Sequence, residues 1–267
     1  RPLAARDHAV ITDPFTIRAP RREDFAAVLN LQNAVDMSEC GIQDSVAEDL
    51  EADWKHARFD LARDAWVVED PSGQLAGYAY LHDDRPGVEF TAGFFMRPAA
   101  AAGSAPAMLG PRLLARIEAR AREMHAAAGT TEKATISVFC PAASRLRQGC
   151  LEGGRYKPMR SFLRMAIDMA KGPPPLLHVE KISIRPFRRN ADAEAVWQLV
   201  NQTFHDHFRY IAKPFEEWKQ ERIGHPKFDP MLCQVAWDKT ELVGALLAVG
   251  VAGFFAFRRL TAFFAIG

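Results

Sequence analysis

The sequence predicts a mixed α/β fold, in which a mixed, mostly antiparallel sheet is flanked by helices, and it predicts this unit twice in succession. Three observations lead to this class: an internal repeat of long period, alternating strand-like and helix-like hydrophobic patterns within each copy, and a proline-rich linker between the copies. Hydrophobic residues make up 48% of the 267 residues and charged residues 25%. These proportions are typical of a globular chain that buries a core.

The internal repeat is visible in three sequence blocks that keep their order. FTIRAPRREDFAAVLNLQNAV, which starts at Phe15, resembles ISIRPFRRNADAEAVWQLVNQTF, which starts at Ile182. Further matches are Phe59-Asp60 with Phe228-Asp229, and the LAG that starts at Leu75 with the LVG that starts at Leu242. The spacing between matched positions changes by no more than two residues from block to block, as loop insertions would produce. The sequence therefore predicts a tandem repeat.

Each copy reads as a strand, two helices and a β-hairpin, and only the first copy continues beyond the hairpin. Its predicted elements are strands at 15–18, 65–68, 75–81, 88–96, 134–139 and 162–169, and helices at 21–35, 44–59, 106–124 and 142–152. Asp44 is the predicted N-cap of the second helix, and DPSG at 70–73 is the predicted hairpin turn. We expect domains at 15–170 and 182–267, joined by a linker at 171–181.

Charge and cysteine spacing narrow the classes of function. A formal net charge of +1 gives no field that would attract nucleic acid or an anionic membrane surface. The four cysteines (Cys40, Cys140, Cys150 and Cys233) contain no CxxC pair and do not fit a zinc site, so we expect inert thiols and no metal. Nothing at the N-terminus resembles a signal peptide, which predicts a cytoplasmic protein. Arg258 and Arg259 interrupt the apolar segment 250–267, which argues against a membrane-spanning helix.

A loop of small residues between a strand and a helix is the first candidate site. The strand ends at Met96, the loop runs from Arg97 to Ala105, and the helix follows. The first N–H groups of a helix have no internal partners, and the helix dipole favours an anion beside them. The arrangement predicts a phosphate site, although such loops also occur as plain connections.

In this order of elements, residues 15–170 resemble the GNAT superfamily of N-acetyltransferases. MRP at Met96 resembles the end of the family's fourth strand, LGPRLL at Leu109 the start of its third helix, and CLEGGRYKPMRSFLRMAIDM from Cys150 its last helix and strand. The resemblance implies acetyl-CoA as co-substrate, with its pyrophosphate at the loop and helix start. The residues implied to hold it are Met96, Arg97, Ser104, Gly110, Pro111 and Arg112.

Two departures from the family pattern leave the activity of the first copy open. If Gly110 takes the last position of the family's R/Q-x-x-G-x-G/A signature, Ala105 and Met108 take the other two. Cys150 stands where the family frequently has a tyrosine acid. Glu89, early in the fourth strand, is the candidate catalytic base, and its alternative is an ordinary solvent-facing strand residue.

The second copy resembles the second half of tandem GNAT proteins of the mycothiol synthase type. The resemblance implies that the segment after its first helix lines a substrate-binding site for the acceptor, through Phe204, Asp206, His207, Phe208 and Trp218. The alternative for Asp206 and His207 is a surface helix end. The family pattern stops near Gly250, as in a shortened or frame-altered product. We expect the apolar tail, 250–267, to pack against the first copy or against a second chain in a homodimer.

The predicted activity is transfer of an acetyl group from acetyl-CoA to a primary amine of a small molecule. The alternative is a catalytically inactive GNAT-like protein that binds acyl-CoA or another ligand. The expected partner is a small-molecule amine acceptor, with neither nucleic acid nor a membrane involved.

Overall fold

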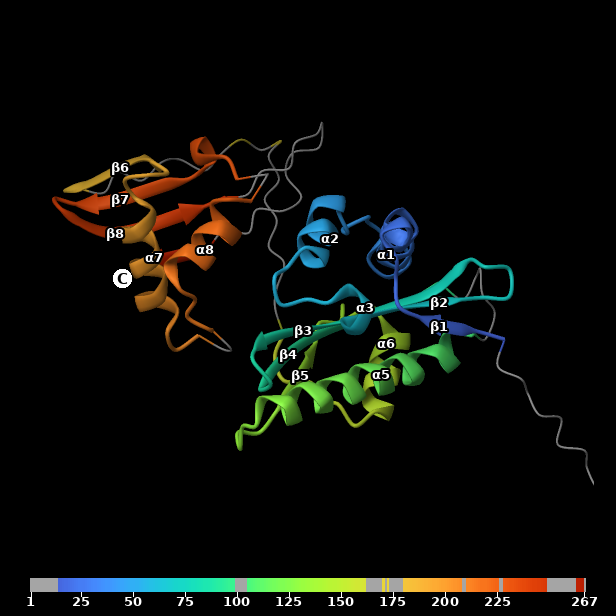
Figure 1. Cartoon of the computed structure of the whole chain (residues 1–267). Coiled ribbons are helices and arrows are strands. Elements are labelled where there is room, and N and C mark those ends of the chain that lie inside the picture. The colour runs from blue at the N-terminus through green and yellow to red at the C-terminus, as the bar shows by residue number, and fades with distance from the viewer. Residues whose placement is uncertain are drawn as a thin grey trace, which may run out of the picture. The chain divides into compact units, whose positions relative to one another are not determined.

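The computed structural model describes residues 14–98, 105–161, 170, 172, 180–207, 210–225, 228–248 and 263–266. The chain divides into two compact units, which we call unit 1 (Arg1–Phe162) and unit 2 (Leu163–Gly267) (Figure 1). The division falls before the expected linker at 171–181, most of which lies outside the described residues.

Unit 1 contains a five-stranded sheet with helices on both faces. Its elements are β1 (Thr16–Arg18), α1 (Phe25–Cys40), α2 (Ala47–Trp54), α3 (Leu61–Asp64), β2 (Ala65–Glu69), β3 (Leu75–Arg85), β4 (Glu89–Met96), α5 (Ala105–Ala128), β5 (Thr135–Val138) and α6 (Arg145–Gly153). This order agrees with the prediction, with the short helix α3 as an addition. The strand expected at 162–169 lies outside the described residues.

The connection between α1 and α2 differs from its prediction. Gly41 ends α1 in the left-handed region at φ 69°, where its N–H donates to Met37 O over 3.0 Å. The N-cap of α2 is Val46, so the prediction of Asp44 was wrong. The turn is instead fixed by the Asp36 carboxylate, which accepts the Ser45 N–H at 2.9 Å and the Ser45 hydroxyl at 2.7 Å. A cap from the preceding helix has no local sequence signature.

The hairpin between β2 and β3 has the turn that its sequence predicts. The Asp70 carboxylate accepts the backbone N–H groups of Ser72 at 2.9 Å and of Gln74 at 3.0 Å. Gly73 has a φ of 80°, a region that side chains disfavour.

The strand order in the sheet of unit 1 is β1-β2-β3-β4-β5, antiparallel except for the parallel pair β4–β5. Strand alternation divides its side chains between two cores. One face packs α5 and α6 on a cluster that contains Leu81, Phe90 and Phe94, and the other packs α1 and α2 on a cluster that contains Val67 and Tyr78. The helix pairs lie on opposite sides of the sheet (Figure 1).

Unit 2 begins with the same order of strands and helices. Its elements are β6 (Ile182–Pro186), α7 (Ala193–Phe204), α8 (Phe215–Arg222), β7 (Gln234–Asp238), β8 (Glu241–Leu247) and β9 (Phe263–Ile266). The sheet order is β6-β7-β8-β9 with antiparallel pairing throughout, as for β1 to β4. β9 lies in the tail, of which residues 249–262 and 267 are outside the described part of the chain.

Two structural details recur at matched positions of the units. Opposite Val68 and Glu69 of β2, β3 contains one extra residue, Ala76, and opposite Ala236 and Trp237 of β7, β8 contains one extra residue, Val243. Each is a β-bulge. Near the end of the first strand of each unit, an arginine forms two hydrogen bonds to an aspartate that follows the strand. Arg18 donates to Asp24 at 2.7 and 2.9 Å, and Arg185 donates to Asp192 at 2.7 Å twice. The repeated sequence thus gives repeated local structure.

The Arg185–Asp192 pair predicts that unit 2 loses stability in acid. The hydrogen bonds from Arg185 lower the pKa of Asp192, whose side chain is only 2% exposed. A carboxyl with a depressed pKa stabilises the fold above its unfolded pKa of about 3.9, and this contribution disappears as the pH falls further. Asp192→Asn should therefore destabilise unit 2 by about 1.5–3 kcal/mol at pH 7.

Hydrogen exchange of unit 2 peptides between pH 7 and pH 3 measures this contribution. The deficit of Asp192→Asn relative to the native chain should shrink toward zero at the acid end. Asp206→Asn, at an exposed position, is the matched control and should change neither value. If Asp192→Asn lowers the stability of unit 2 by the same amount at both pH values, the ionised Asp192 does not stabilise the unit through Arg185.

Candidate active site

The candidate site lies where β4 continues beyond the end of β5. The two strands pair in parallel up to Ala92 and Val138, and β4 then continues from Gly93 to Met96. Within the described ranges, no strand pairs with this edge of β4 after Ala92. We call residues 93–96 the open edge.

The alternation of main-chain N–H and C=O groups along β4 decides which of them face this edge. The Arg97 N–H donates to Ala76 O over 2.9 Å, on the β3 side. Successive residues of a strand direct their main-chain groups to opposite sides, so those of Phe94 and Met96 face away from β3. The open edge therefore presents peptide groups that can bind a carbonyl or an amide.

The N-terminus of α5 follows the open edge in sequence, across the loop 97–104. α5 begins at Ala105, so its unpaired N–H groups belong to Ala105, Ala107 and Met108, because Pro106 has no N–H. The expectation that Gly110, Pro111 and Arg112 form this N-terminus was wrong, because they lie about one and a half turns further along. Pro106 fits the first turn of a helix, which allows α5 to start earlier than the family signature implies.

Gly110 has a packing role that its motif position conceals. A Cβ atom there would lie 2.4 Å from the Sγ atom of Cys150 and 3.2 Å from the Sδ atom of Met96. The missing side chain allows α5 to approach α6 closely. Burial raises the pKa of the Cys150 thiol, which keeps it neutral.

The predicted cofactor residues near the loop are already engaged by the protein. The Met96 side chain is 3% exposed and lies in the core beneath α5. The Arg97 guanidinium is paired with Asp70 at 2.8 Å and donates to Leu75 O, which holds it at the β2–β3 hairpin. Ser104 lies outside the described residues. The main chain at Met96 is thus better placed than either side chain to meet a ligand.

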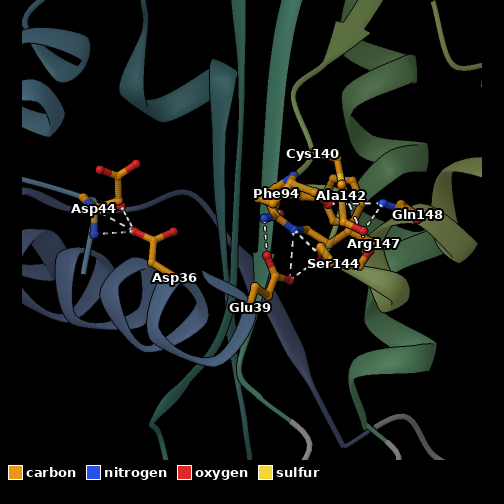
Figure 2. Close-up of polar contacts among 11 residues, drawn as sticks. Asp36, Glu39, Asp44, Phe94, Cys140, Ala142, Ser144, Arg147 and Gln148 are labelled. Carbon is orange, nitrogen blue, oxygen red and sulfur yellow. Dashed lines mark hydrogen bonds and ion pairs between the residues drawn. The ribbon is translucent and has the colours of Figure 1, made fainter. Parts of the chain in front are cut away.

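A buried ion pair spans the open edge (Figure 2). Arg147 of α6 is 3% exposed; its Nη2 group pairs with the Glu39 carboxylate of α1, and its Nε atom lies 3.2 Å from Glu39 Oε1. The Nε atom also donates to Ser144 Oγ at 3.0 Å, and the Ser144 hydroxyl donates to Glu39. The Nη1 group reaches Phe94 O at 3.5 Å, and the guanidinium lies 5.2 Å from the centre of the Phe95 ring. These contacts link α1, β4 and α6 at one point.

Aromatic and polar side chains of β3 line the face of the sheet covered by α1 and α2. Tyr78, Tyr80 and His82 occupy every second position of β3, so their side chains lie on this same face. The centre of the Tyr80 ring lies 5.3 Å from that of His82. His82 stacks on Phe59 at 4.6 Å, and its Nε2 atom lies 3.8 Å from Asp53 Oδ1. Burial lowers the pKa of His82 to about 4, so its imidazole is neutral at pH 7 and can accept a hydrogen bond.

Glu89, the predicted base, lies at the opposite end of β4 from the open edge. Four residues separate it from Gly93, which is about 13 Å along an extended strand. Its carboxylate lies 3.4 Å from Arg85 Nε and is 23% exposed. Of the two interpretations of Glu89, the geometry favours an ordinary strand residue over a catalytic base.

The predicted acceptor residues of unit 2 do not form one surface. Trp218 is 6% exposed and belongs to the core of unit 2 with Val196 and Val235. Phe204, at the end of α7, lies 5.4 Å from the ring of His207, which is exposed together with Asp206. Phe208 lies outside the described residues. The pattern of Phe204 and His207 fits a helix end, and the burial of Trp218 gives it a structural role.

No local pattern in the sequence identified Glu39, Arg147 or Tyr80 as site residues. Glu39 and Arg147 are 108 residues apart. A charged residue on the inner face of the amphipathic segment 142–152 was the only sign that could have drawn attention to Arg147.

Comparisons with known proteins agree with this architecture. No protein-family model and no curated protein matches the chain. A GCN5-related N-acetyltransferase from Sphaerobacter thermophilus is similar in structure, with 25% identity and a TM-score of 0.71, over 90% of this chain and 73% of that one. A match of that extent includes residues of both units. A glucosamine N-acetyltransferase region of a fungal multi-domain GH3 β-N-acetylglucosaminidase shares 12% identity at a TM-score of 0.50, over 90% of this chain and 28% of that one.

These structural neighbours are GNAT N-acetyltransferases, and the chain has their mixed α/β fold. Among the described residues, no group of three or more His, Cys, Asp or Glu side chains is placed to hold a metal ion. No helix in the same part of the chain is long and apolar enough to span a membrane.

Proposed function

We propose that unit 1 transfers an acetyl group from acetyl-CoA to a primary amine of a small molecule. The observation that supports this most is the open edge of β4 followed in sequence by the N-terminus of α5. Peptide groups of Phe94 and Met96 would bind the thioester carbonyl and the pantetheine amides, and the N–H groups of Ala105, Ala107 and Met108 would bind the pyrophosphate. The likeness to the S. thermophilus acetyltransferase supports the same chemistry.

Such a site needs little covalent machinery. Holding an amine beside a thioester in reacting geometry lowers the barrier by roughly 7–11 kcal/mol. Main-chain donors at the open edge would also stabilise the oxyanion that forms when the amine attacks the thioester carbonyl.

We further propose that unit 2 is a second, GNAT-like copy and that the two units work as a tandem protein. The matched bulges and arginine–aspartate pairs support this, as does the extent of the match to the S. thermophilus protein. The acceptor's identity, homodimer formation and a cytoplasmic location stay predictions.

The second candidate function is binding of an acyl-CoA without turnover. Two observations favour it: Arg147 already contacts the Phe94 carbonyl, and Cys150 stands where a tyrosine acid is frequent in GNAT proteins. Release of free thiol from acetyl-CoA in the presence of a panel of small amines distinguishes the two functions. Amine-dependent release supports transfer, whereas calorimetric binding of acetyl-CoA without release supports the binder.

A charge change at Met108 tests the position of the pyrophosphate. Met108 is 50% exposed in the first turns of α5, so a substitution there disturbs little packing. Met108→Glu should weaken acetyl-CoA binding about three- to tenfold, because a carboxylate at a helix N-terminus competes with and repels the phosphates. Met108→Gln, of nearly the same shape, is the control and should bind like the native chain.

Isothermal titration calorimetry at low ionic strength measures both variants. Equal affinity of Met108→Glu and Met108→Gln would show that the pyrophosphate does not bind at this helix.

A further inference from the structure

Tyr80 reaches the open edge from the neighbouring strand. It pairs with Gly93, the first residue of β4 beyond the last β4–β5 pair. A Cβ atom at Gly93 would lie 2.6 Å from the Cε1 and Cζ atoms of Tyr80 and 2.7 Å from its hydroxyl. The phenol therefore lies flat over the backbone of Gly93, in space that any side chain at 93 would fill.

The hydroxyl of Tyr80 differs from that of Tyr78, its neighbour on the same face. Tyr78 OH accepts the Trp54 Nε1–H at 3.0 Å and is fully buried. Within the described part of the chain, the Tyr80 hydroxyl forms no hydrogen bond to the protein, and the residue keeps an intermediate exposure to solvent. An unpaired, partly buried hydroxyl at the open edge is a group that a substrate can engage.

The surroundings keep this hydroxyl protonated. Burial, with the negative charges of Asp53 and Asp84, raises the pKa of Tyr80 to about 12, although the positive charge of Arg147 acts in the opposite direction. At neutral pH the phenol is therefore a hydrogen-bond and proton donor.

We infer that Tyr80 is a catalytic residue that donates a proton to the leaving sulfur of the thioester. The inference rests on the proposed acetyl transfer at the open edge. The amine nitrogen forms a bond to the acyl carbon, the C–S bond breaks, and its electron pair goes to sulfur. The Tyr80 hydroxyl gives its proton to that sulfur, and the phenolate takes the proton that the new amide nitrogen loses. The balance is one amine and one thioester consumed, and one amide and one thiol formed.

The test compares two acyl donors in the full chain. A thioester of an aromatic thiol has an acidic leaving group, which departs without a proton donor, whereas the alkyl thiol of acetyl-CoA needs one. Tyr80→Phe should lower kcat/KM with acetyl-CoA about 100-fold, within the range for general acid catalysis. With S-acetyl thiophenol the same variant should react almost as fast as the native chain.

The ratio of the two rates is independent of the amount of folded protein, so a loss of stability does not affect it. Tyr78→Phe removes a hydroxyl two residues away that is bonded to Trp54, and this control should leave the ratio unchanged. Acetyl-CoA affinity of Tyr80→Phe should equal that of the native chain by calorimetry.

Two results would overturn the inference in different ways. A native chain without acetyl transfer would remove the proposed function and this role with it. A native chain that transfers acetyl groups, with equal losses for both donors in Tyr80→Phe, would leave the function standing and exclude proton donation by Tyr80.

Discussion

Replacing Arg147 with alanine is expected to lower the free energy of unfolding of unit 1 by about 3–5 kcal/mol. The Arg147 side chain is 4% exposed and that of Glu39 is 16% exposed, so the substitution leaves a carboxylate buried without its partner. It also removes the hydrogen bonds to Ser144 and to Phe94 O. α1, β4 and α6 would then lose their shared anchor at the open edge.

Glu39→Ala should cost a similar amount, since it leaves the guanidinium unpaired. The double variant should be less destabilised than the two single losses together, because no buried charge remains without a partner. Hydrogen exchange on peptides from β4 and α6 measures each loss within unit 1. The exposed pair Arg122–Glu118 is the control, and Arg122→Ala should change stability by no more than about 1 kcal/mol. Strictly additive losses at Arg147 and Glu39 would contradict a coupled buried pair.

Phe90→Ala is expected to destabilise unit 1 by about 3–5 kcal/mol. The Phe90 side chain is fully buried in β4 and faces α5, in the cluster that includes Leu113 and Ile117. Removing the ring loses its burial and leaves a cavity beneath the helix that the sheet cannot fill.

Phe139→Ala is the matched control, because that ring is 61% exposed just after β5. It should change the stability by less than about 0.5 kcal/mol. Denaturant-dependent hydrogen exchange of β3 and β4 peptides compares the variants. A loss at Phe90 as small as that expected at Phe139 would mean that the register of β4 differs from the one described, since a shift of one residue exchanges the faces of a strand.

The sequence by itself determined the order of the elements. Periodicity located β3, β4 and α5, because their hydrophobic faces are set by contacts that recur every two or every three to four residues. The Asp70 turn was also predictable, since the side chain and the main-chain groups it binds lie within four residues. Local bonds leave local signatures.

Helix boundaries followed the sequence less closely. The N-cap of α2 was misplaced, because it depends on Asp36 from the preceding helix. The start of α5 was predicted within one residue, at 106, but the motif placed Gly110, Pro111 and Arg112 at its N-terminus, and these residues lie inside the helix.

Only the tertiary structure decided which residues meet at the open edge. Glu39 and Arg147 are far apart in sequence, and their pairing depends on β5 ending at Val138 while β4 continues. The approach of Tyr80 to Gly93 depends likewise on the register of two strands. The motif placed Gly110 at a phosphate site, whereas the structure shows that a side chain at position 110 would collide with Cys150. The physical reason is common to all three: a site is made by contacts between distant segments, and periodicity within a segment carries no record of them.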